Sequence, residues 1–132
     1  MNEIMKLCDL VRETSFAIHC YHRSGHLEKI YENALIHRLR KQSLDVRQHH
    51  PVTVYDEDGT VLGNLVADLM VESSLIVKLK ACKSLTDEHI AQLFGYLKAA
   101  RFEHGLLINF GAPKLQIRKF ILTPGYNEPQ EY

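Results

Sequence analysis

The sequence predicts a single α/β domain in which a mixed β-sheet is flanked by α-helices. Its 132 residues fit the usual size of one domain, and its 45% hydrophobic and 24% charged residues are typical of a globular protein. Hydrophobic spacing gives the order helix, helix, three strands, helix, strand, strand. A strand–helix–strand crossover favours a parallel pair, whereas hairpins are antiparallel, so the sheet should contain both.

Two helices are predicted at the start of the chain. From residue 3 to about residue 21, hydrophobic residues recur at roughly helical spacing, and Ser24-Gly25 then interrupts the pattern. A stronger hydrophobic stripe begins at His26, with members at Leu27, Ile30, Tyr31, Ala34, Leu35 and Leu39. Glu28 lies at the edge of this stripe, so we expect its carboxylate beside the core and not in open water.

A three-stranded meander should follow. Val46, Val52 and Val54 fall on alternate positions, as in a half-buried strand, and the segment 56–59 (Asp-Glu-Asp-Gly) supplies a turn. The returning segment, residues 61–71, is nearly all apolar and is predicted to be covered on both faces. Residues 75–81 form the third predicted strand.

The second half of the chain predicts one helix and two more strands. Thr86-Asp87-Glu88 resembles a capped helix start, and that helix should end near Arg101. Residues 105–110 read as a buried strand, and residues 115–122 as a more exposed final strand. Residues 124–132 are rich in turn formers and are expected to fray. We therefore expect one domain over residues 1–132 with a core over about 10–122.

Charge and cysteine content exclude several classes of protein. Lys plus Arg and Asp plus Glu both number 16, so no overall field attracts the chain to nucleic acid, and such binding requires a local patch. The three cysteines lack CxxC spacing, which excludes a disulfide framework and a four-thiolate zinc site. The chain shows no signal-peptide layout and no apolar run of about 20 residues. A cytoplasmic protein is predicted.

Asp68 is the most informative single residue, because a carboxylate inside an apolar strand is costly unless it is paired or binds a metal. If the turn after Val71 uses three residues, Val71 pairs with Leu75 and Asp68 lies opposite Lys78, with Lys80 on the same face; a two-residue turn would move Asp68 to the other face. Such a cluster, with Glu28 arriving from a helix, contains the parts of a hydrolytic magnesium site. A buried salt bridge between Asp68 and Lys78 is the alternative interpretation.

Several motifs in order make the chain resemble a known family. They are Gly25-His26-Leu27-Glu28-Lys29-Ile30-Tyr31, Ala67-Asp68-Leu69, Leu79-Lys80-Ala81, Ala91-Gln92-Leu93 with Tyr96-Leu97-Lys98, and Gly105 to Leu115. Over roughly residues 10–122 the chain resembles the GxxExxY proteins, a branch of the PD-(D/E)XK nuclease superfamily. The resemblance implies a restriction-endonuclease-like core and a phosphodiesterase site that binds Mg²⁺ or Mn²⁺.

The resemblance also implies roles for individual residues. Glu28 would be the helix carboxylate and Asp68 the first strand ligand, so these two would hold the metal. Lys80 would be the catalytic lysine. Gln92 and Tyr96, four residues apart on one helix face, match the glutamine and tyrosine that flank the site in RecB-like nucleases.

One departure from the family pattern puts catalysis in question. Where the superfamily has an acidic residue two positions before the lysine, this chain has Lys78. At ~4 Å and an effective dielectric constant of ~20, a unit charge pair interacts by ~4 kcal/mol, enough to erase ordinary Mg²⁺ affinity. Glu88, one helical turn before Gln92, could supply a migrated carboxylate, whereas Glu72 is too far along the strand. A depressed pKa of Lys78 is a second rescue, which Asp68 and Glu28 oppose.

Two hypotheses for function therefore stay open. The first is a divalent-metal-dependent nuclease, impaired by Lys78. The second is a catalytically silent nuclease fold that binds nucleic acid or protein. DNA is favoured over RNA as the nucleic acid, and no membrane partner is expected. The first helix and a sheet edge offer surfaces for a homodimer, although nothing in the sequence requires one. A zinc site drawn from His19, Cys20, His22 and His26 fits no established spacing.

Overall fold

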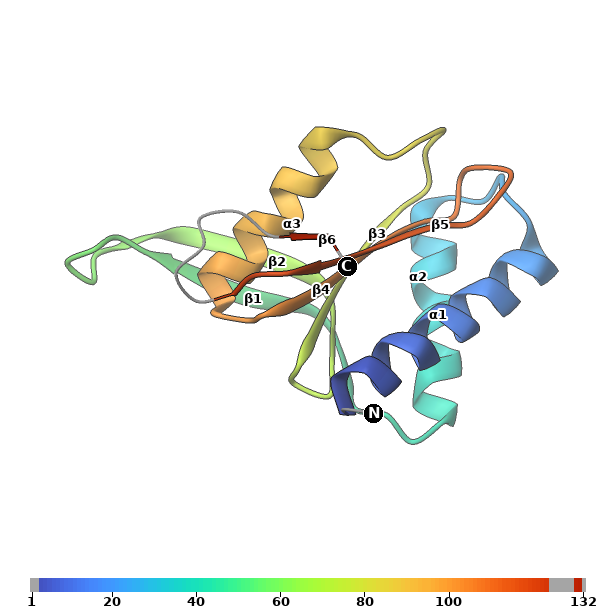
Figure 1. The fold of residues 1–132 in the computed structure, drawn as a ribbon, viewed down its shortest axis with the longest axis horizontal. Coiled ribbons are helices and arrows are strands. Elements are labelled where there is room, and N and C mark those ends of the chain that lie inside the picture. Colours follow the sequence, from blue (N-terminus) through green and yellow to red (C-terminus); the bar gives the residue numbers. More distant parts are fainter. Residues whose placement is uncertain (1–2, 124–129, 132) are drawn as a thin grey trace.

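The computed structural model describes residues 3–123 and 130–131. Two helices precede a three-stranded meander, and a third helix connects the meander to the rest of the sheet (Figure 1). The elements are α1 (Glu3–His22), α2 (Glu28–Lys41), β1 (Val46–Tyr55), β2 (Val61–Val71), β3 (Leu75–Lys80), α3 (Asp87–Ala100), β4 (His104–Asn109), β5 (Gln116–Ile121) and β6 (Gln130–Glu131). Thr86 caps α3 by accepting a hydrogen bond from the backbone N–H of His89, as the sequence predicts.

The strands form one sheet in sequence order, from β1 to β6. β3 and β4 are parallel because α3 crosses between them, and the other neighbouring pairs are antiparallel. The mixed sheet flanked by helices is therefore confirmed, and it is the restriction-endonuclease-like arrangement that the resemblance implies.

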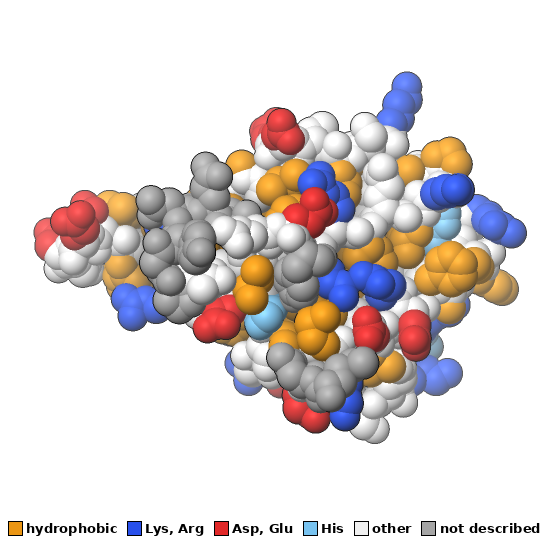
Figure 2. Space-filling view, viewed as in Figure 1, with side chains coloured by type: hydrophobic (Ala, Val, Ile, Leu, Met, Phe, Trp, Pro, Cys, Tyr) orange, Lys and Arg blue, Asp and Glu red, His pale blue; other side chains and the backbone are white. Residues whose placement is uncertain are grey.

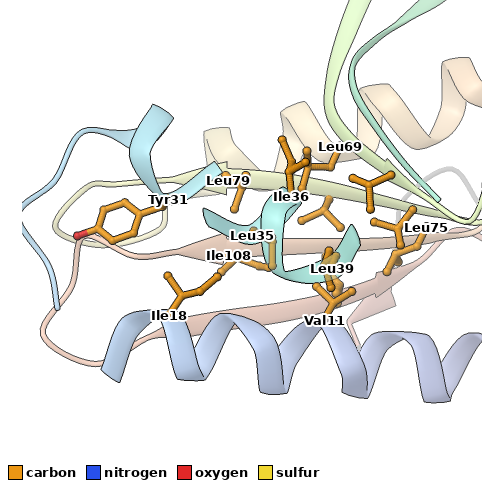
Figure 3. Close-up of a cluster of buried hydrophobic side chains, with 14 of the residues drawn as sticks. Val11, Ile18, Tyr31, Leu35, Ile36, Leu39, Leu69, Leu75, Leu79 and Ile108 are labelled. Atoms are coloured by element: carbon orange, nitrogen blue, oxygen red, sulfur yellow. The ribbon is translucent and has the colours of Figure 1, made fainter. Parts of the chain in front are cut away.

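Each face of the sheet carries its own hydrophobic cluster. On one face, Val11 and Ile18 of α1 and Leu35 of α2 pack against Leu79 and Ile108 of the central strands (Figure 3). On the other face, Leu93 and Leu97 of α3 pack with Ile76, Leu107 and Phe120. Each fully buried side chain of this size contributes about 1.5–3 kcal/mol relative to an exposed one. The two clusters therefore fix α2 and α3 on opposite faces of the central strands.

β1 and β2 change faces midway along their length. Val46 and Leu69 belong to the cluster under α1 and α2, whereas Val52 and Ala67 belong to the cluster under α3. His49, at the crossover in β1, has a φ of 52°, a left-handed conformation that is uncommon within a strand. Asp68 lies between Ala67 and Leu69, so it stands at the point where β2 passes from one hydrophobic cluster to the other.

The far half of β2 corrects one prediction. Residues 61–64 and Val66 are exposed, so this strand is not covered on both faces along its whole length. The reason is the short pairing with β3, which spans only Leu69–Val71 of β2 and leaves the β1–β2 hairpin to extend beyond its neighbours (Figure 1). Apolar composition alone could not reveal how far the next strand reaches.

The end of the chain also differs from expectation in part. Gln130 and Glu131, within the segment expected to fray, pair with Ile121 and Phe120 as the short strand β6. Glu131 additionally forms a bidentate ion pair with Arg118, at 2.5 and 2.7 Å. Residues 124–129 and 132 lie outside the described residues. Among the described helices, none combines the length and apolar character needed to cross a membrane.

Candidate functional site

Asp68 occupies the point where β2 and β3 separate. Of the two turn lengths left open by the sequence, the β2–β3 turn has three residues. Val71 pairs with Leu75, and regular pairing ends at Leu69 and Val77. Beyond that end, Oδ2 of Asp68 accepts a hydrogen bond from the backbone N–H of Leu79 at 2.9 Å. The side chain thus takes the place of a backbone acceptor in the gap between the two strands.

Lys78 pairs with the same carboxylate. Its Nζ lies 3.4 Å from Oδ1 of Asp68, and the two side chains are only 13% and 14% exposed. The Nζ atom also lies 5.2 Å from the ring centroid of Tyr96 on α3, within the range of a cation–π interaction. The ammonium group is therefore held by a carboxylate on one side and an aromatic ring on the other.

Glu28 and Lys80 lie in the same electrostatic environment. Partial burial raises the pKa of Glu28 above its ordinary value, the charge of Asp68 raises it further, and Lys80 and Lys78 lower it. Glu28 is the exposed first residue of α2, and Lys80 is the partly buried last residue of β3. Within the described residues, no hydrogen bond or ion pair joins Glu28 to Asp68, so these carboxylates interact through space.

Gln92 is the candidate residue for which the described part of the structure shows no polar contact with the others. It lies one turn before Tyr96 on α3, and its side chain is exposed. In the described part of the chain it makes no hydrogen bond to Glu28, Asp68 or either lysine. The fold therefore brings Lys78 against both Asp68 and Tyr96 and places Glu28 and Lys80 within electrostatic reach, whereas Gln92 is exposed on α3.

The donor set does not fit the divalent metal that the resemblance implies. A Mg²⁺ or Mn²⁺ site in a protein needs several oxygen ligands, and here both carboxylate oxygens of Asp68 already accept hydrogen bonds. Lys78 places a +1 charge directly beside Asp68. No group of three His, Cys, Asp or Glu side chains suited to a metal occurs among the described residues.

The alternatives weighed for a metal site do not supply the missing ligand. Glu88 is exposed in the first turn of α3, and Glu72 is exposed in the β2–β3 turn. In the candidate zinc cluster, Nε2 of His19 donates a buried hydrogen bond to the carbonyl of Ala112 at 2.9 Å. This bond explains His19 as a link between α1 and the β4–β5 loop.

A buried carboxylate that sequence reasoning missed lies one turn after Glu28. The Glu32 side chain is only 7% exposed, and its Oε2 accepts hydrogen bonds from Gln48 at 2.8 Å and Lys29 at 2.9 Å. His49 Nε2 lies 3.2 Å from the same oxygen. These contacts join α2 to β1 at the crossover. The only local signal was an acidic residue on the stripe that carries Tyr31 and Leu35.

Tyr31, the last residue of the GxxExxY motif, fixes the loop that precedes Glu28. Its hydroxyl donates to the carbonyl of Arg23 at 2.5 Å and accepts from the backbone N–H of His26 at 3.1 Å. Its ring stacks on Phe110 with centroids 4.8 Å apart. Gly25 has a φ of 120°, which favours glycine, so the motif builds a tight loop that ends at Glu28.

Asn109 fixes the loop that follows Lys80. Its side chain accepts from the backbone N–H of Cys82 and donates to the Cys82 carbonyl, at 3.0 and 2.9 Å. A side chain at Gly111 would approach the Cys82 nitrogen to 2.3 Å, so only glycine fits this contact. The loops on both sides of the candidate site are therefore pinned by side chains that touch backbone.

Comparison with known families agrees with this geometry. A family model described as the PD-(D/E)XK nuclease superfamily matches residues 5–120. No curated protein and no solved structure matches the chain. The narrower resemblance to the GxxExxY proteins stays a prediction. Since the family model spans α1 to the last residues of β5 and includes every candidate residue, the chain belongs to the PD-(D/E)XK nuclease superfamily.

Proposed function

We propose that this chain is a DNA-binding member of the nuclease superfamily whose metal-dependent phosphodiester hydrolysis is strongly impaired by Lys78. The observation that carries the proposal is the Nζ of Lys78 at 3.4 Å from Oδ1 of Asp68, with both side chains largely buried. Within the family pattern, the position of Lys78 belongs to an acidic metal ligand. A cation held there by Asp68 and Tyr96 repels a divalent ion and occupies the carboxylate that would bind it.

The remaining parts of the site support binding of a phosphate backbone. Lys80 lies at the end of β3 beside the pair, and in the described part of the chain it forms no ion pair. A lysine binds phosphate as a point charge. With Asp68 neutralised by Lys78, the anionic character of the site is reduced to Glu28, whose pKa is raised. The site is therefore less repulsive to a phosphate than two free carboxylates would be.

The proposal includes a cytoplasmic location and a homodimer. No disulfide joins Cys8, Cys20 and Cys82 in the described part of the chain, which fits a reducing cytoplasm. β1 is an edge strand of the sheet, and a homodimer through this edge or through α1 is compatible with the fold. Neither statement is needed for the proposed chemistry.

The test is cleavage of fluorescent single- and double-stranded DNA and RNA, with Mg²⁺ or Mn²⁺, by the wild type, Lys78→Glu and Lys78→Gln. The wild type should bind DNA without cutting it. Lys78→Glu should gain Mn²⁺-dependent cleavage, and adding Lys80→Ala should abolish that gain. Lys78→Gln removes the positive charge without adding a ligand and should stay inactive, which makes it the matched control.

Metal binding gives an independent readout on the same variants. At a free Mn²⁺ concentration one hundred times the dissociation constant, a site that exists only in the folded protein adds about 2.7 kcal/mol to the free energy of unfolding. We expect such stabilisation for Lys78→Glu and none for the wild type. Wild-type cleavage that is lost in Lys80→Ala would overturn the proposal and establish a working nuclease. A folded Lys78→Glu variant that binds Mn²⁺ without cutting would refute the view that one residue switches the site off.

A further inference from the structure

We infer that the end of the molecule where α1 stops carries a binding surface for unpaired bases of single-stranded nucleic acid, outside the Asp68–Lys78 pair. The inference deepens the proposed function and rests on it, because it names the form of nucleic acid bound. We call this region the α1-end surface and define it by five residues: Tyr21, Arg23, Leu27, Lys83 and Lys114.

The surface presents an aromatic ring and an apolar side chain to solvent. Tyr21 is 77% exposed and Leu27 is 78% exposed, which makes them the most exposed large hydrophobic side chains described. The Tyr21 ring contacts that of His22, and a series of edge-on ring contacts continues through His26 to the buried ring of Tyr31. The exposed ring is therefore supported by a packed aromatic series and not by a loose loop.

Three segments that are distant in the sequence meet at this end of the fold. The last turn of α1 is joined to the β4–β5 loop by the hydrogen bond from His19 to Ala112. The same loop is joined to the segment after β3, because Asn109 bonds to Cys82 and to the backbone N–H of Gly111. Lys83 directly follows Cys82, and Lys114 lies two residues after Ala112.

None of these three segments contains an acidic residue. Residues 14–27, 73–86 and 104–120 lack Asp and Glu entirely, although the whole chain has 16 of them. In the described part of the chain, Arg23, Lys83 and Lys114 take part in no ion pair. Figure 2 shows basic and hydrophobic side chains with a histidine at the right-hand tip, and no acidic side chain is visible there. These three segments therefore carry basic side chains and no acidic ones, whereas Glu28 follows Leu27 directly and Glu13 shares a cavity with Leu115.

Exposed aromatic rings beside unpaired cations are the features that bind single strands. An exposed ring stacks on the face of an unpaired base, whereas the bases of a duplex are stacked on one another. The basic side chains contact the phosphates of the same strand. A duplex could use the charges but not the ring, whereas a strand with unpaired bases uses both.

Two residues of the surface lie close in sequence to the candidate site. Leu27 directly precedes Glu28, and Lys83 lies three residues after Lys80 on the segment that leaves β3. A strand bound by Tyr21 and Lys83 is therefore expected to lie near the segment that begins at Lys80. The α1-end surface supplies affinity and direction for a strand whose backbone reaches the proposed phosphate contact.

The experiment is fluorescence anisotropy with the full chain and three 20-nucleotide probes: oligo(dT), a duplex and an abasic strand. We expect oligo(dT) to bind at least fivefold more tightly than the other two. Tyr21→Ala should weaken oligo(dT) binding about tenfold and leave abasic binding unchanged, whereas Tyr21→Phe should stay within about twofold of the wild type. Tyr55→Ala, at a tyrosine that is 59% exposed on the β1–β2 hairpin, is the matched control and should have no effect.

Charge variants separate the phosphate contacts from stacking. Lys114→Gln should weaken all three probes to a similar extent and lower the dependence of log K on log salt by about one. Equal binding of abasic and oligo(dT) strands, a preference for duplex, or insensitivity to Tyr21→Ala would overturn the inference and leave the proposed DNA binding intact. Failure to bind any of the probes would overturn both.

Discussion

Removing the charge of Asp68 is expected to cost several kcal/mol of stability, and the structure allows the loss to be divided. At 3.4 Å and an effective dielectric constant of about 20, the pair with Lys78 is worth about 5 kcal/mol of direct attraction, from which the desolvation of both groups must be subtracted. Breaking such a pair by removing one partner costs about 3–5 kcal/mol, because the other charge stays buried.

Two substitutions of the same residue separate the ion pair from the backbone contact. Asp68→Asn removes the charge but keeps an acceptor for the N–H of Leu79, whereas Asp68→Ala removes both. The alanine variant should therefore lose a further 1–3 kcal/mol, the usual cost of an unpaired buried donor. Combining Asp68→Asn with Lys78→Met removes both charges and should recover most of the loss of the single asparagine variant.

Urea denaturation followed by circular dichroism measures these differences, because the chain contains no tryptophan for a fluorescence probe. For a slope of about 2 kcal/mol/M, a loss of 3 kcal/mol lowers the midpoint by about 1.5 M. The reasoning is refuted if the Asp68→Asn and Lys78→Met effects add to within about 0.5 kcal/mol, the result for independent sites. Equal stability of the asparagine and alanine variants would instead remove the role assigned to the Leu79 hydrogen bond.

Three further predictions test the residues around the pair. The pKa of Glu28 is raised in the folded state above its ordinary value of 4.5. The stability that the protonated carboxyl contributes is therefore present below pH 4.5 and is lost as the pH rises through the raised pKa. Urea midpoints over about pH 4–7 should show this fall in the wild type and not in Glu28→Gln. Tyr31→Phe keeps the stacked ring but removes both loop hydrogen bonds, so denaturation should show a loss of about 1–2 kcal/mol, and an unchanged midpoint would contradict that role. Asn109→Ala leaves both backbone groups of Cys82 without their partner, and hydrogen exchange should show lost protection of the Cys82 amide, whereas retained protection would exclude the side chain as its acceptor.

Much of the fold could be predicted because its elements are locally encoded. The sequence left the length of the turn after Val71 open between two and three residues, but it linked a three-residue turn to pairing of Val71 with Leu75 and of Asp68 with Lys78, which is the arrangement found. The crossover from β3 to β4 predicted a parallel pair, which the structure confirms. In both cases the pairing of neighbouring strands depends on the length of the segment that connects them, which can be counted in the sequence.

The parts that sequence reasoning missed depend on contacts between distant segments. Glu32 is buried because Gln48 and Lys29 surround its carboxylate, and nothing near Glu32 in the sequence shows that β1 will lie there. The left-handed conformation of His49 likewise lies where β1 passes from one hydrophobic cluster to the other, which its neighbours in the sequence do not show. Gln92, placed with the site by its spacing from Tyr96, is exposed on α3, and its part in the site stays a prediction.

The hydrogen bond from the backbone N–H of Leu79 to Asp68 gives this carboxylate a structural role that is independent of catalysis. The amide belongs to the scaffold, and it needs an acceptor whether or not hydrolysis occurs. A substitution of Asp68 by a residue without an acceptor therefore lowers the free energy of unfolding, because the N–H of Leu79 loses its partner. A lysine at position 78 instead forms an ion pair with the carboxylate of Asp68. Asp68 therefore has a structural reason to be retained, and its presence does not by itself indicate that the site hydrolyses phosphodiester bonds.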